Sequence, residues 1–404
     1  MNPVFDRVRL FDGSMGALLG QMGFQTACPD EMTLTHPEVI FDIHRQYVEA
    51  GADVVITDSF GSTEMALAHK KKSGMGARFA VRAVEIARKA AGDRALVAAD
   101  FGPTSEFMYP VGEKTFEDFY HTFLEQARAA RDAGADFGII ETQTDVAECR
   151  AACLALRDAG LMPLSSFSIG ENGRTLTGSP AECCALSLAA AGAFALGLNC
   201  ASGPEALLSP LEKMRAVTPL PVVVQPNAGL PRSRPDGGVF YPYDPETFAR
   251  FVRPLVSAGA SGVGGCCGTT PAHIAAIRPL AGGAVPAPAC DGLRRVCSAR
   301  SAALLEDALL RVCPLDDPED AYDLDEDASM ALVSLIGKSP SEARDEAILC
   351  AAATRLPLMF RAGADDLEAL EAALRAYPGV ACADAPSSAE ELLARYGAAR
   401  ASEA

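Results

Sequence analysis

Short apolar runs alternate with longer amphipathic segments along roughly the first two-thirds of this 404-residue chain. Eight of the runs are rich in β-branched or small apolar residues, and most are apolar throughout rather than at every second position. That pattern is typical of strands buried on both faces of a parallel sheet. The predicted strands occupy residues 8–13, 53–60, 95–102, 137–144, 163–169, 194–200, 221–227 and 261–268.

In the segments between these runs, apolar residues recur at helical spacing, most clearly at 37–50. Gly51, Gly134 and Gly259 each follow a predicted helix end, where glycine can adopt the left-handed conformation that closes a helix. Strands that alternate with helices in this number predict an α/β fold, a (β/α)8 TIM barrel over residues 1–285. An open doubly wound sheet is the alternative, but the first strand is followed by DGSMGALLG, which lacks the G-x-G-x-x-G fingerprint of that fold.

A small C-terminal α/β module is predicted after the barrel, at residues 329–404. Two short apolar runs at 357–363 and 379–385 predict strands, with an amphipathic helix between them. Residues 286–328 are predicted to form a linker that carries an acidic run. This run, at 316–327, has eight acidic residues and no basic ones, which is typical of a solvated, flexible segment.

The charge balance narrows the range of partners. With 35 Lys and Arg against 53 Asp and Glu, the net charge of −18 repels phosphate, so neither nucleic acid nor a membrane surface is expected as a partner. No uncharged apolar run is long enough to span a bilayer, and the first residues lack a secretory segment, which predicts a cytoplasmic protein. The odd number of 13 cysteines then favours reduced thiols or a metal site over a disulfide framework.

Polar residues and thiols gather at the carboxyl ends of the predicted strands, where the active sites of such barrels lie. Because these ends meet at one mouth, we expect the groups to lie together although they are far apart in the chain. They are Asp12 and Gly13, Thr57 to Ser59, Glu141 and Thr142, Asn199 and Cys200, Asn227, and Cys266 and Cys267.

Three of these cysteines predict a zinc site. Cys266 and Cys267 lie between glycines in GGCCG, just before a predicted helix N-terminus whose positive end favours thiolates. Cys200 ends the sixth predicted strand. Three converging thiolates suit Zn²⁺, and because structural zinc sites normally have four protein ligands, the fourth position is expected to take an exchangeable ligand. The alternative is that the adjacent cysteines are inert buried thiols.

The charge of such a site indicates its chemistry. Zn²⁺ with three thiolates has a net charge of about −1, which makes it a poor activator of water but a suitable holder of a nucleophilic thiolate. The site therefore predicts alkylation of a thiol rather than hydrolysis, since hydrolytic zinc usually has His or carboxylate ligands. None of the five histidines lies at a predicted strand end. His273, in the helix after the cysteine pair, is expected on the helix surface, and the alternative is that it supports the metal ligands from behind.

Several stretches of the chain resemble the homocysteine S-methyltransferase family. They are FDGSMGALL at 11–19, GPT at 102–104, IIETQTD at 139–145, GLNCASGP around Cys200, PNAGLP at 226–231 and GGCCGTTPAHI at 264–274. The resemblance is closest to the N-terminal homocysteine-binding barrel of cobalamin-dependent methionine synthase. It covers roughly residues 5–285, and GLNC followed by GGCCG is its most specific part.

This resemblance implies a TIM barrel in which Cys200, Cys266 and Cys267 hold zinc. Homocysteine would bind the metal through its sulfur and attack an activated methyl group, giving methionine. The family pattern makes Asp12 and Glu141 the expected contacts of the substrate ammonium. Backbone N–H groups at Gly13 and Ser14 would take its carboxylate, and Asn227 would be a labile fourth ligand. Asp12 and Glu141 could instead cap their own turns, and Asn227 could be a plain turn residue.

The methyl donor is less constrained by the sequence. The chain has no D-x-H-x-x-G cobalamin motif, so methylcobalamin would have to arrive on a separate corrinoid protein. Betaine or S-methylmethionine are the alternatives. An onium donor would benefit from an aromatic cage, and the chain has no Trp, although Tyr109, Tyr241 and Tyr243 could serve.

Two other functions are alternatives to methyl transfer. A non-catalytic role would make the barrel a homocysteine-binding or zinc-binding subunit. A lyase that uses a lysine Schiff base is disfavoured, because no lysine lies at a predicted strand end.

Asp58 and Ser59 stand where the family usually has Asn and Thr, and Thr33 stands where Asn is common. These departures leave the donor and substrate contacts open, while the cysteine triad is intact.

Overall fold

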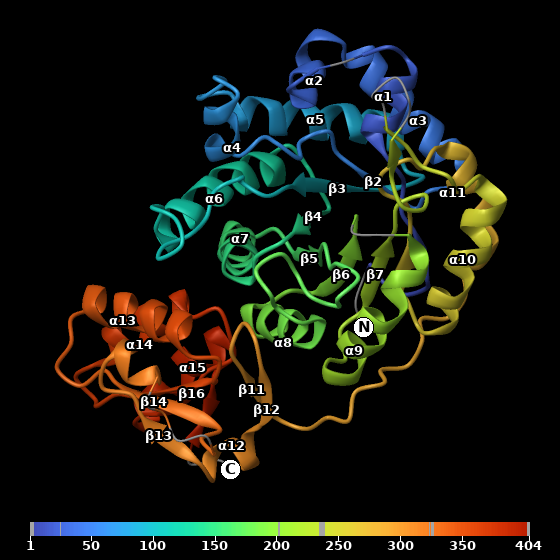
Figure 1. The fold of residues 1–404 in the computed structure, drawn as a ribbon. Coiled ribbons are helices and arrows are strands. Elements are labelled where there is room, and N and C mark those ends of the chain that lie inside the picture. Colours follow the sequence, from blue (N-terminus) through green and yellow to red (C-terminus); the bar gives the residue numbers. More distant parts are fainter. Residues whose placement is uncertain are drawn as a thin grey trace.

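Eight parallel strands form a closed barrel in the computed structural model, which describes residues 4–24, 26–200, 203–233, 239–322, 324 and 327–401. The strand order is β1-β10-β7-β6-β5-β4-β3-β2, and a bridge between Phe11 and Val54 joins the end of β1 to β2. Strands β2 to β7 follow one another around the barrel in Figure 1. The TIM barrel is therefore confirmed. Its strands are β1 Arg9–Leu10, β2 Val54–Ile56, β3 Leu96–Phe101, β4 Phe137–Gln143, β5 Pro163–Phe167, β6 Ala195–Asn199, β7 Val222–Gln225 and β10 Gly262–Val263.

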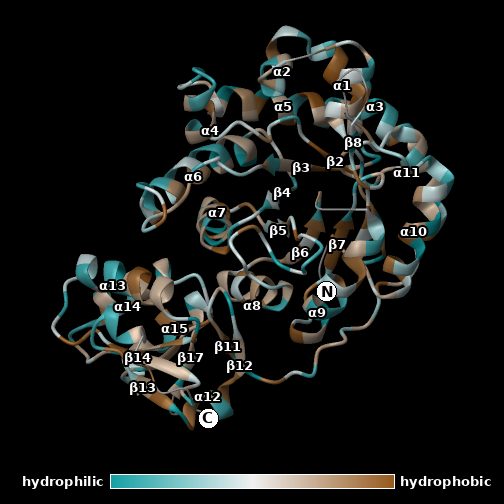
Figure 2. Ribbon diagram, in the orientation of Figure 1, coloured by the Kyte–Doolittle hydropathy of each residue, from teal (hydrophilic) through white to brown (hydrophobic). Residues whose placement is uncertain are grey.

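Helices surround this barrel and turn their apolar sides toward the strands (Figure 2). Gly51, Gly134 and Gly259 follow helices with φ of 105°, 94° and 103°, as predicted for left-handed caps. The helices are α1 Met15–Gln21, α2 Met32–Thr35, α3 Pro37–Ala50, α4 Glu64–His69, α5 Gly76–Ala91, α6 Phe116–Asp132, α7 Val146–Ala159, α8 Ala181–Ala191, α9 Leu208–Val217, α10 Pro245–Ser257 and α11 Pro271–Ile277. Short 3-10 helices lie at Pro29–Glu31, Pro204–Leu207 and Arg278–Leu280. None of the described helices is long and apolar enough to cross a membrane.

The inside of the barrel changes from apolar to polar toward its mouth. A buried apolar cluster from the strands fills the interior, and it includes Ala98, Ile139 and Ala195. Because side chains on a strand face the same side at every second position, the residues further along these strands also face inward. Those residues are polar: Asp100, Glu141, Ser166, Asn199 and Gln225. The barrel therefore positions a polar layer directly above its apolar core.

The C-terminal unit is a parallel sheet of order β13-β14-β15-β16-β17 with helices packed on it. Its strands are β13 Val312–Pro314, β14 Met330–Ser334, β15 Leu358–Arg361, β16 Cys382–Asp384 and β17 Ala399–Arg400, and its helices are α13 Pro340–Ala353, α14 Leu367–Ala376 and α15 Glu390–Tyr396. The α/β module is confirmed, with β15 and β16 at the predicted strands. The strands β13, β14 and β17 were not predicted.

Residues 286–328, predicted as a linker, contain regular structure. The antiparallel pair β11 (Arg295–Cys297) and β12 (Ala302–Leu304) leads through α12 (Leu305–Leu309) to β13. Within the acidic run, Pro318–Tyr322 is a 3-10 helix, and residues 323, 325 and 326 lie outside the described residues. The sheet of the C-terminal unit thus begins inside the segment predicted as a linker.

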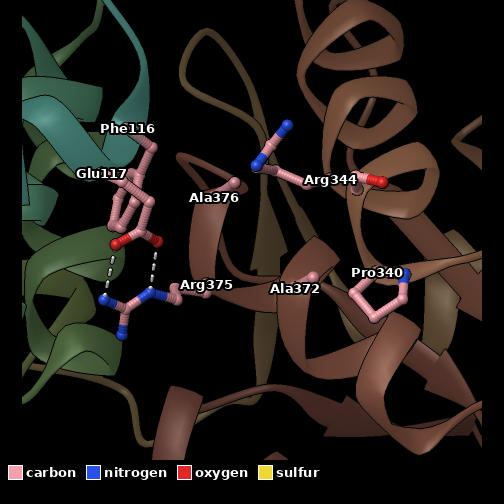
Figure 3. A pocket seen from close by; sticks show the side chains of 8 residues that line it. Phe116, Glu117, Pro340, Arg344, Ala372, Arg375 and Ala376 are labelled. Atoms are coloured by element: carbon pink, nitrogen blue, oxygen red, sulfur yellow. Dashed lines mark hydrogen bonds and ion pairs between the residues drawn. The ribbon is translucent and has the colours of Figure 1, made fainter.

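The C-terminal unit packs against the α6 to α8 side of the barrel. Arg375 makes two hydrogen bonds of 2.9 and 3.2 Å to Glu117 at the start of α6 (Figure 3). Its guanidinium also lies 4.1 Å from the centre of the Tyr120 ring. The buried Arg150 of α7 donates to the carbonyl of Leu374 over 3.1 Å. These contacts link the two units.

Candidate metal and substrate site

Three thiols meet at the mouth of the barrel. Cys200 directly follows β6, and Cys266 and Cys267 lie just beyond β10. Their sulfur atoms all lie within 4.8 Å of one another, and those of Cys200 and Cys267 are 3.5 Å apart. The structure therefore brings together the three predicted ligands. In the part of the chain that the structure describes, no other group of three metal-ligating side chains is found.

Tight backbone packing explains why small residues precede the cysteine pair. A Cβ atom on Gly264 would lie 2.7 Å from Cβ of Phe11, and one on Gly265 would lie 2.4 Å from Oγ1 of Thr269. The Cys266 N–H donates to the Pro226 carbonyl over 2.9 Å. The turn is thus held against β1 and the end of β7, and any side chain in place of either glycine would displace it.

Asn227 ties the two thiol-bearing segments together. Its Nδ2 donates to the carbonyl of Cys200, and its Oδ1 accepts from the N–H of Cys267, each over 3.1 Å. Both polar groups of the Asn227 amide are therefore engaged by the backbone of the expected ligands. The residues that follow Cys200 in the GLNCASGP motif, Ala201 and Ser202, lie outside the described residues.

The geometry and the chemistry of the thiols both fit zinc. Tetrahedral Zn²⁺ with Zn–S bonds of ≈ 2.3 Å separates its sulfur ligands by about 3.8 Å. The separations found here, 3.5 Å for one pair and at most 4.8 Å for the rest, reach that value with small side-chain movements. Hydrogen bonds from the Cys200 and Cys266 thiols lower the pKa of Cys267 to about 3. The pKa values of Cys200 and Cys266 are raised, so one of the three thiols holds the negative charge and the other two donate hydrogen bonds to it.

Two carboxyl groups lie beside the thiols. Oδ2 of Asp12 accepts the Ile56 N–H over 2.8 Å, while its buried Oδ1 has no hydrogen-bond partner. Burial raises the pKa of Asp12, and the nearby Glu141 raises it further. Burial and the neighbouring Cys267 raise the pKa of Glu141 to about 7. Both carboxyl groups would therefore gain from a cationic group placed between them.

Gly13 and Ser14 lie at the start of α1. A Cβ atom on Gly13 would lie 2.6 Å from Oγ1 of Thr269, so the close approach needs glycine. Oγ of Ser14 caps α1 by accepting the Ala17 N–H over 3.0 Å, and the Ser14 N–H donates to Thr269 over 3.2 Å. Tyr47 donates to the Ser14 carbonyl over 2.9 Å. The N–H expected to bind a carboxylate thus has Thr269 as its partner in this structure.

Two further residues shape the site: Asn199, which was predicted at the mouth but without a role, and Asp100, which was not predicted. Oδ1 of Asn199 accepts from the Thr142 N–H and from the Ser166 hydroxyl, each over 2.9 Å, and so ties the ends of β4, β5 and β6 together. Asp100 is buried in β3, and its Oδ1 has no partner. A carboxylate inside an otherwise apolar strand was the signal that could have identified Asp100.

The position of His273 differs from the predicted one. It is only 6% exposed rather than on a helix surface. Its Nδ1 lies 2.9 Å from Oγ1 of Thr270 at the start of α11, and its Nε2 lies 2.9 Å from the carbonyl of Tyr243. The imidazole therefore joins the helix after the cysteine pair to the segment that precedes α10.

The fold and the thiol triad together define a (β/α)8 barrel with three converging thiols at its mouth. The sequence profile of the family described as Homocysteine S-methyltransferase matches residues 9–281. This match covers more than half of the chain, and the chain belongs to the homocysteine S-methyltransferase family.

Solved structures of the homocysteine methyltransferase MmuM from Escherichia coli are similar to the barrel. The metallated form has 27% identity and a TM-score of 0.57, and the match covers 67% of this chain and 96% of that one. The oxidized form has 28% identity and a TM-score of 0.58, covering 67% and 95%. The similarity thus spans nearly all of MmuM and leaves about a third of this chain without a counterpart there.

Proposed function

We propose that this protein transfers a methyl group to the thiol of homocysteine and so forms methionine, with zinc held by Cys200, Cys266 and Cys267. The observation that carries the proposal is the convergence of three sulfurs within 4.8 Å at the barrel mouth. When bound, zinc would lower the pKa of the substrate thiol and hold it as a nucleophilic thiolate. The need for reduced ligands agrees with a cytoplasmic location.

The residues around the thiols orient the substrate. Asp12 and Glu141 receive the ammonium group. Oδ1 of Asp12 lacks a hydrogen-bond partner, and a cation would stabilise the ionised form of both carboxyl groups, whose pKa values are raised. The backbone at Gly13 and Ser14 receives the carboxylate, with Thr269 giving up its bond to the Ser14 N–H. Asn227 holds the Cys200 and Cys267 segments in register, and this engagement favours a positioning role over that of a labile fourth ligand.

The donor that we favour is methylcobalamin carried by a separate corrinoid protein, as in cobalamin-dependent methionine synthase. Exposed apolar side chains on loops at the mouth support a protein-borne donor, because such patches mark interaction surfaces. Phe107, Tyr109 and Val111, in the loop after β3, are 46%, 41% and 80% exposed. Phe60 and Leu230, in the loops after β2 and β7, are 40% and 49% exposed.

A cationic donor such as betaine or S-methylmethionine is the second candidate. The observation that favours it is the surplus of buried carboxyl groups at the mouth. Oδ2 of Asp58 and Oδ1 of Asp100 have no partners, in addition to the free oxygen of Asp12. Burial raises the pKa of Asp58 and Asp100, and one homocysteine ammonium cannot stabilise the charged form of all these groups. A cationic donor would supply further positive charge. A zinc-binding and homocysteine-binding subunit without activity is the third candidate.

A panel of donors tests these candidates. The zinc-loaded protein would be incubated with homocysteine and each of four donors: free methylcobalamin, methylcobalamin on a corrinoid protein, betaine and S-methylmethionine. Methionine formed only with the corrinoid protein would support the favoured donor, and Cys266→Ala should abolish it. Formation with betaine or S-methylmethionine would replace that donor with a cationic one. If the protein binds homocysteine but forms no methionine with any donor, the binding subunit without activity is the one candidate that remains.

A further inference from the structure

Two residues at the barrel mouth have a positive φ although neither is glycine. Thr142, which follows Glu141, has a φ of 58°, and Cys200 has a φ of 59°. Residues with a side chain disfavour this conformation, and for a β-branched residue such as Thr it is rare. It persists only where the surrounding structure holds it in place. The hydrogen bonds of these two segments therefore show what fixes the geometry of the mouth.

Thr142 lies in a bulge of β4, where the pairing with β5 shifts register between Ile140 and Gln143. Two residues of β4, Glu141 and Thr142, therefore lie opposite the single residue Ser166 of β5. Bulges next to functional sites change the direction in which a side chain points. The shape of this bulge thus decides where the carboxyl group of Glu141 lies.

The side chain of Asn199 holds the bulge from β6, which lies beside β5 and β4 in the barrel (Figure 1). Its Oδ1 accepts from the Thr142 N–H and from the Ser166 hydroxyl, each over 2.9 Å, and its Nδ2 donates to Oγ1 of Thr142 over 2.8 Å. Because a backbone N–H can only donate, these bonds also fix the orientation of the amide. Asn199 is 0% exposed, so water does not compete for them.

Asn199 also begins the turn that carries Cys200. Its backbone pairs with Gln225 of β7, and the Cys200 N–H donates to the Gln225 carbonyl over 3.4 Å. One residue therefore holds the bulge of Glu141 through its side chain and leads into Cys200 through its backbone. The separation of the Glu141 carboxyl from the thiols depends on this connection.

We propose that Asn199 is a positioning residue that sets the spacing between Glu141 and the zinc, and that this spacing selects the length of the acceptor thiol. The inference rests on the proposed function and goes beyond it by naming the residue that selects among amino thiols. Homocysteine spans the two contacts, with its sulfur on the metal and its ammonium at Glu141. Cysteine itself is one methylene shorter and cannot reach both. A difference of one methylene changes recognition by roughly 10-fold to 200-fold.

The test measures the binding of amino thiols to the zinc-loaded protein by calorimetry, with no methyl donor present. The unmodified protein should bind homocysteine at least about 10-fold more tightly than cysteine. In Asn199→Ala the bulge is released, so homocysteine should bind about 10-fold more weakly and the preference over cysteine should nearly disappear. 4-Mercaptobutanoate keeps the sulfur but lacks the ammonium, and its affinity should be the same in both proteins.

A second variant tests the same connection from the other side. Thr142→Val keeps the β-branched shape but removes the Oγ1 that accepts from Asn199, so the preference for homocysteine should fall by about 3-fold. This variant decides the question if Asn199→Ala does not fold.

Gln126→Leu is the matched control, because Gln126 also uses a buried amide to join strand ends at the mouth. Its Nε2 donates to the carbonyls of Ser59 and Asp100 over 3.0 and 2.9 Å, after β2 and in β3 rather than at the bulge of β4. Gln126→Leu should keep the preference of the unmodified protein for homocysteine.

The outcomes separate this inference from the proposed function. If homocysteine binds and both Asn199→Ala and Thr142→Val keep the original preference, the role of Asn199 is overturned and the proposed function stands. Equal binding of homocysteine and cysteine by the unmodified protein would overturn it as well. So would a similar loss in Gln126→Leu or a loss of 4-mercaptobutanoate binding, since the effect would then be general. If the zinc-loaded unmodified protein binds no homocysteine, the proposed function fails and this inference fails with it.

Discussion

The sulfur atoms of Cys200 and Cys267 lie 3.5 Å apart although 67 residues separate them in the chain. They come from β6 and β10, with only β7 between them in the sheet. The two thiols form no disulfide, and their proximity is the arrangement that the proposed zinc site requires.

Removing either sulfur should therefore remove the metal. Cys200→Ala and Cys267→Ala are expected to lose nearly all of the zinc, about one ion per chain, that the unmodified protein retains after dialysis against a chelator. Cys153→Ala is the matched control, because Cys153 is fully buried in α7 away from the triad. Elemental analysis of the purified proteins measures the zinc content. Full zinc in either triad variant would contradict the ligand assignment.

Glu141 should act on the substrate ammonium and not on its thiol. Glu141→Gln keeps the size of the side chain but removes its charge, so it should lower kcat/KM for homocysteine by roughly 10-fold to 100-fold, mainly through KM. The control is on the substrate: 4-mercaptobutanoate, which lacks the amino group, should react equally well with both proteins. A similar loss with both thiols would show that Glu141 acts on the metal or on the fold.

The parts of the fold that follow from local pattern were predicted from the sequence. Continuous apolar runs identified the barrel strands, and glycine caps such as Gly51 marked the helix ends. The thiol triad followed from the rule that strand ends meet at one mouth, once Cys200 and Cys267 had been placed on strands. Each of these inferences starts from a local signal: an apolar run, a glycine at a helix end, or a cysteine at a strand end.

What the sequence did not reveal depends on contacts between distant segments. His273 looks like a surface residue on its own helix, and only the approach of Tyr243 explains its burial. Asn199 gives no local sign that it joins three strand ends. The two-residue strand β17 and the three-residue strand β13 are too short for a periodic pattern, and they exist because the sheet of the C-terminal unit extends to them.

Asp58 should make the stability of the protein depend on pH. Burial, with the nearby Asp30, raises the pKa of Asp58 in the folded chain to about 8, whereas an unfolded Asp titrates near ≈ 3.9. Between these values the folded state keeps a proton that the unfolded state has lost, so a rise in pH favours unfolding. The free energy of unfolding should fall as pH rises from about 4 to about 8, by on the order of a few kcal/mol from this group.

Asp58→Asn removes that dependence and tests it. The variant should be more stable than the unmodified protein at pH 8, and the difference should shrink as the pH falls toward 4. Asp307→Asn, at an exposed position of α12, controls for the loss of one negative charge. Urea unfolding followed at several pH values gives the free energies. A pH-independent difference between Asp58→Asn and the unmodified protein would show that Asp58 does not titrate as described.

Arg375 should hold the C-terminal unit on the barrel. It lines one side of a cavity of about 400 Å³ between the units and donates to both oxygens of Glu117 (Figure 3). Its guanidinium also stacks on Tyr120. The side chain of Arg375 is 19% exposed, so the ion pair is partly shielded from water, and its loss should cost about 1–2 kcal/mol.

The matched variant is Arg344→Met, since Arg344 lines the same cavity but pairs with Asp345 in its own helix over 2.7 Å. In Arg375→Met, amide hydrogen exchange at the start of α6 and the end of α14 should accelerate by roughly 5-fold to 30-fold, which corresponds to that free energy. Arg344→Met should leave these amides unchanged. If both variants exchange like the unmodified protein, the contact of Arg375 with Glu117 does not contribute to docking, and the buried Arg150 becomes the residue to test.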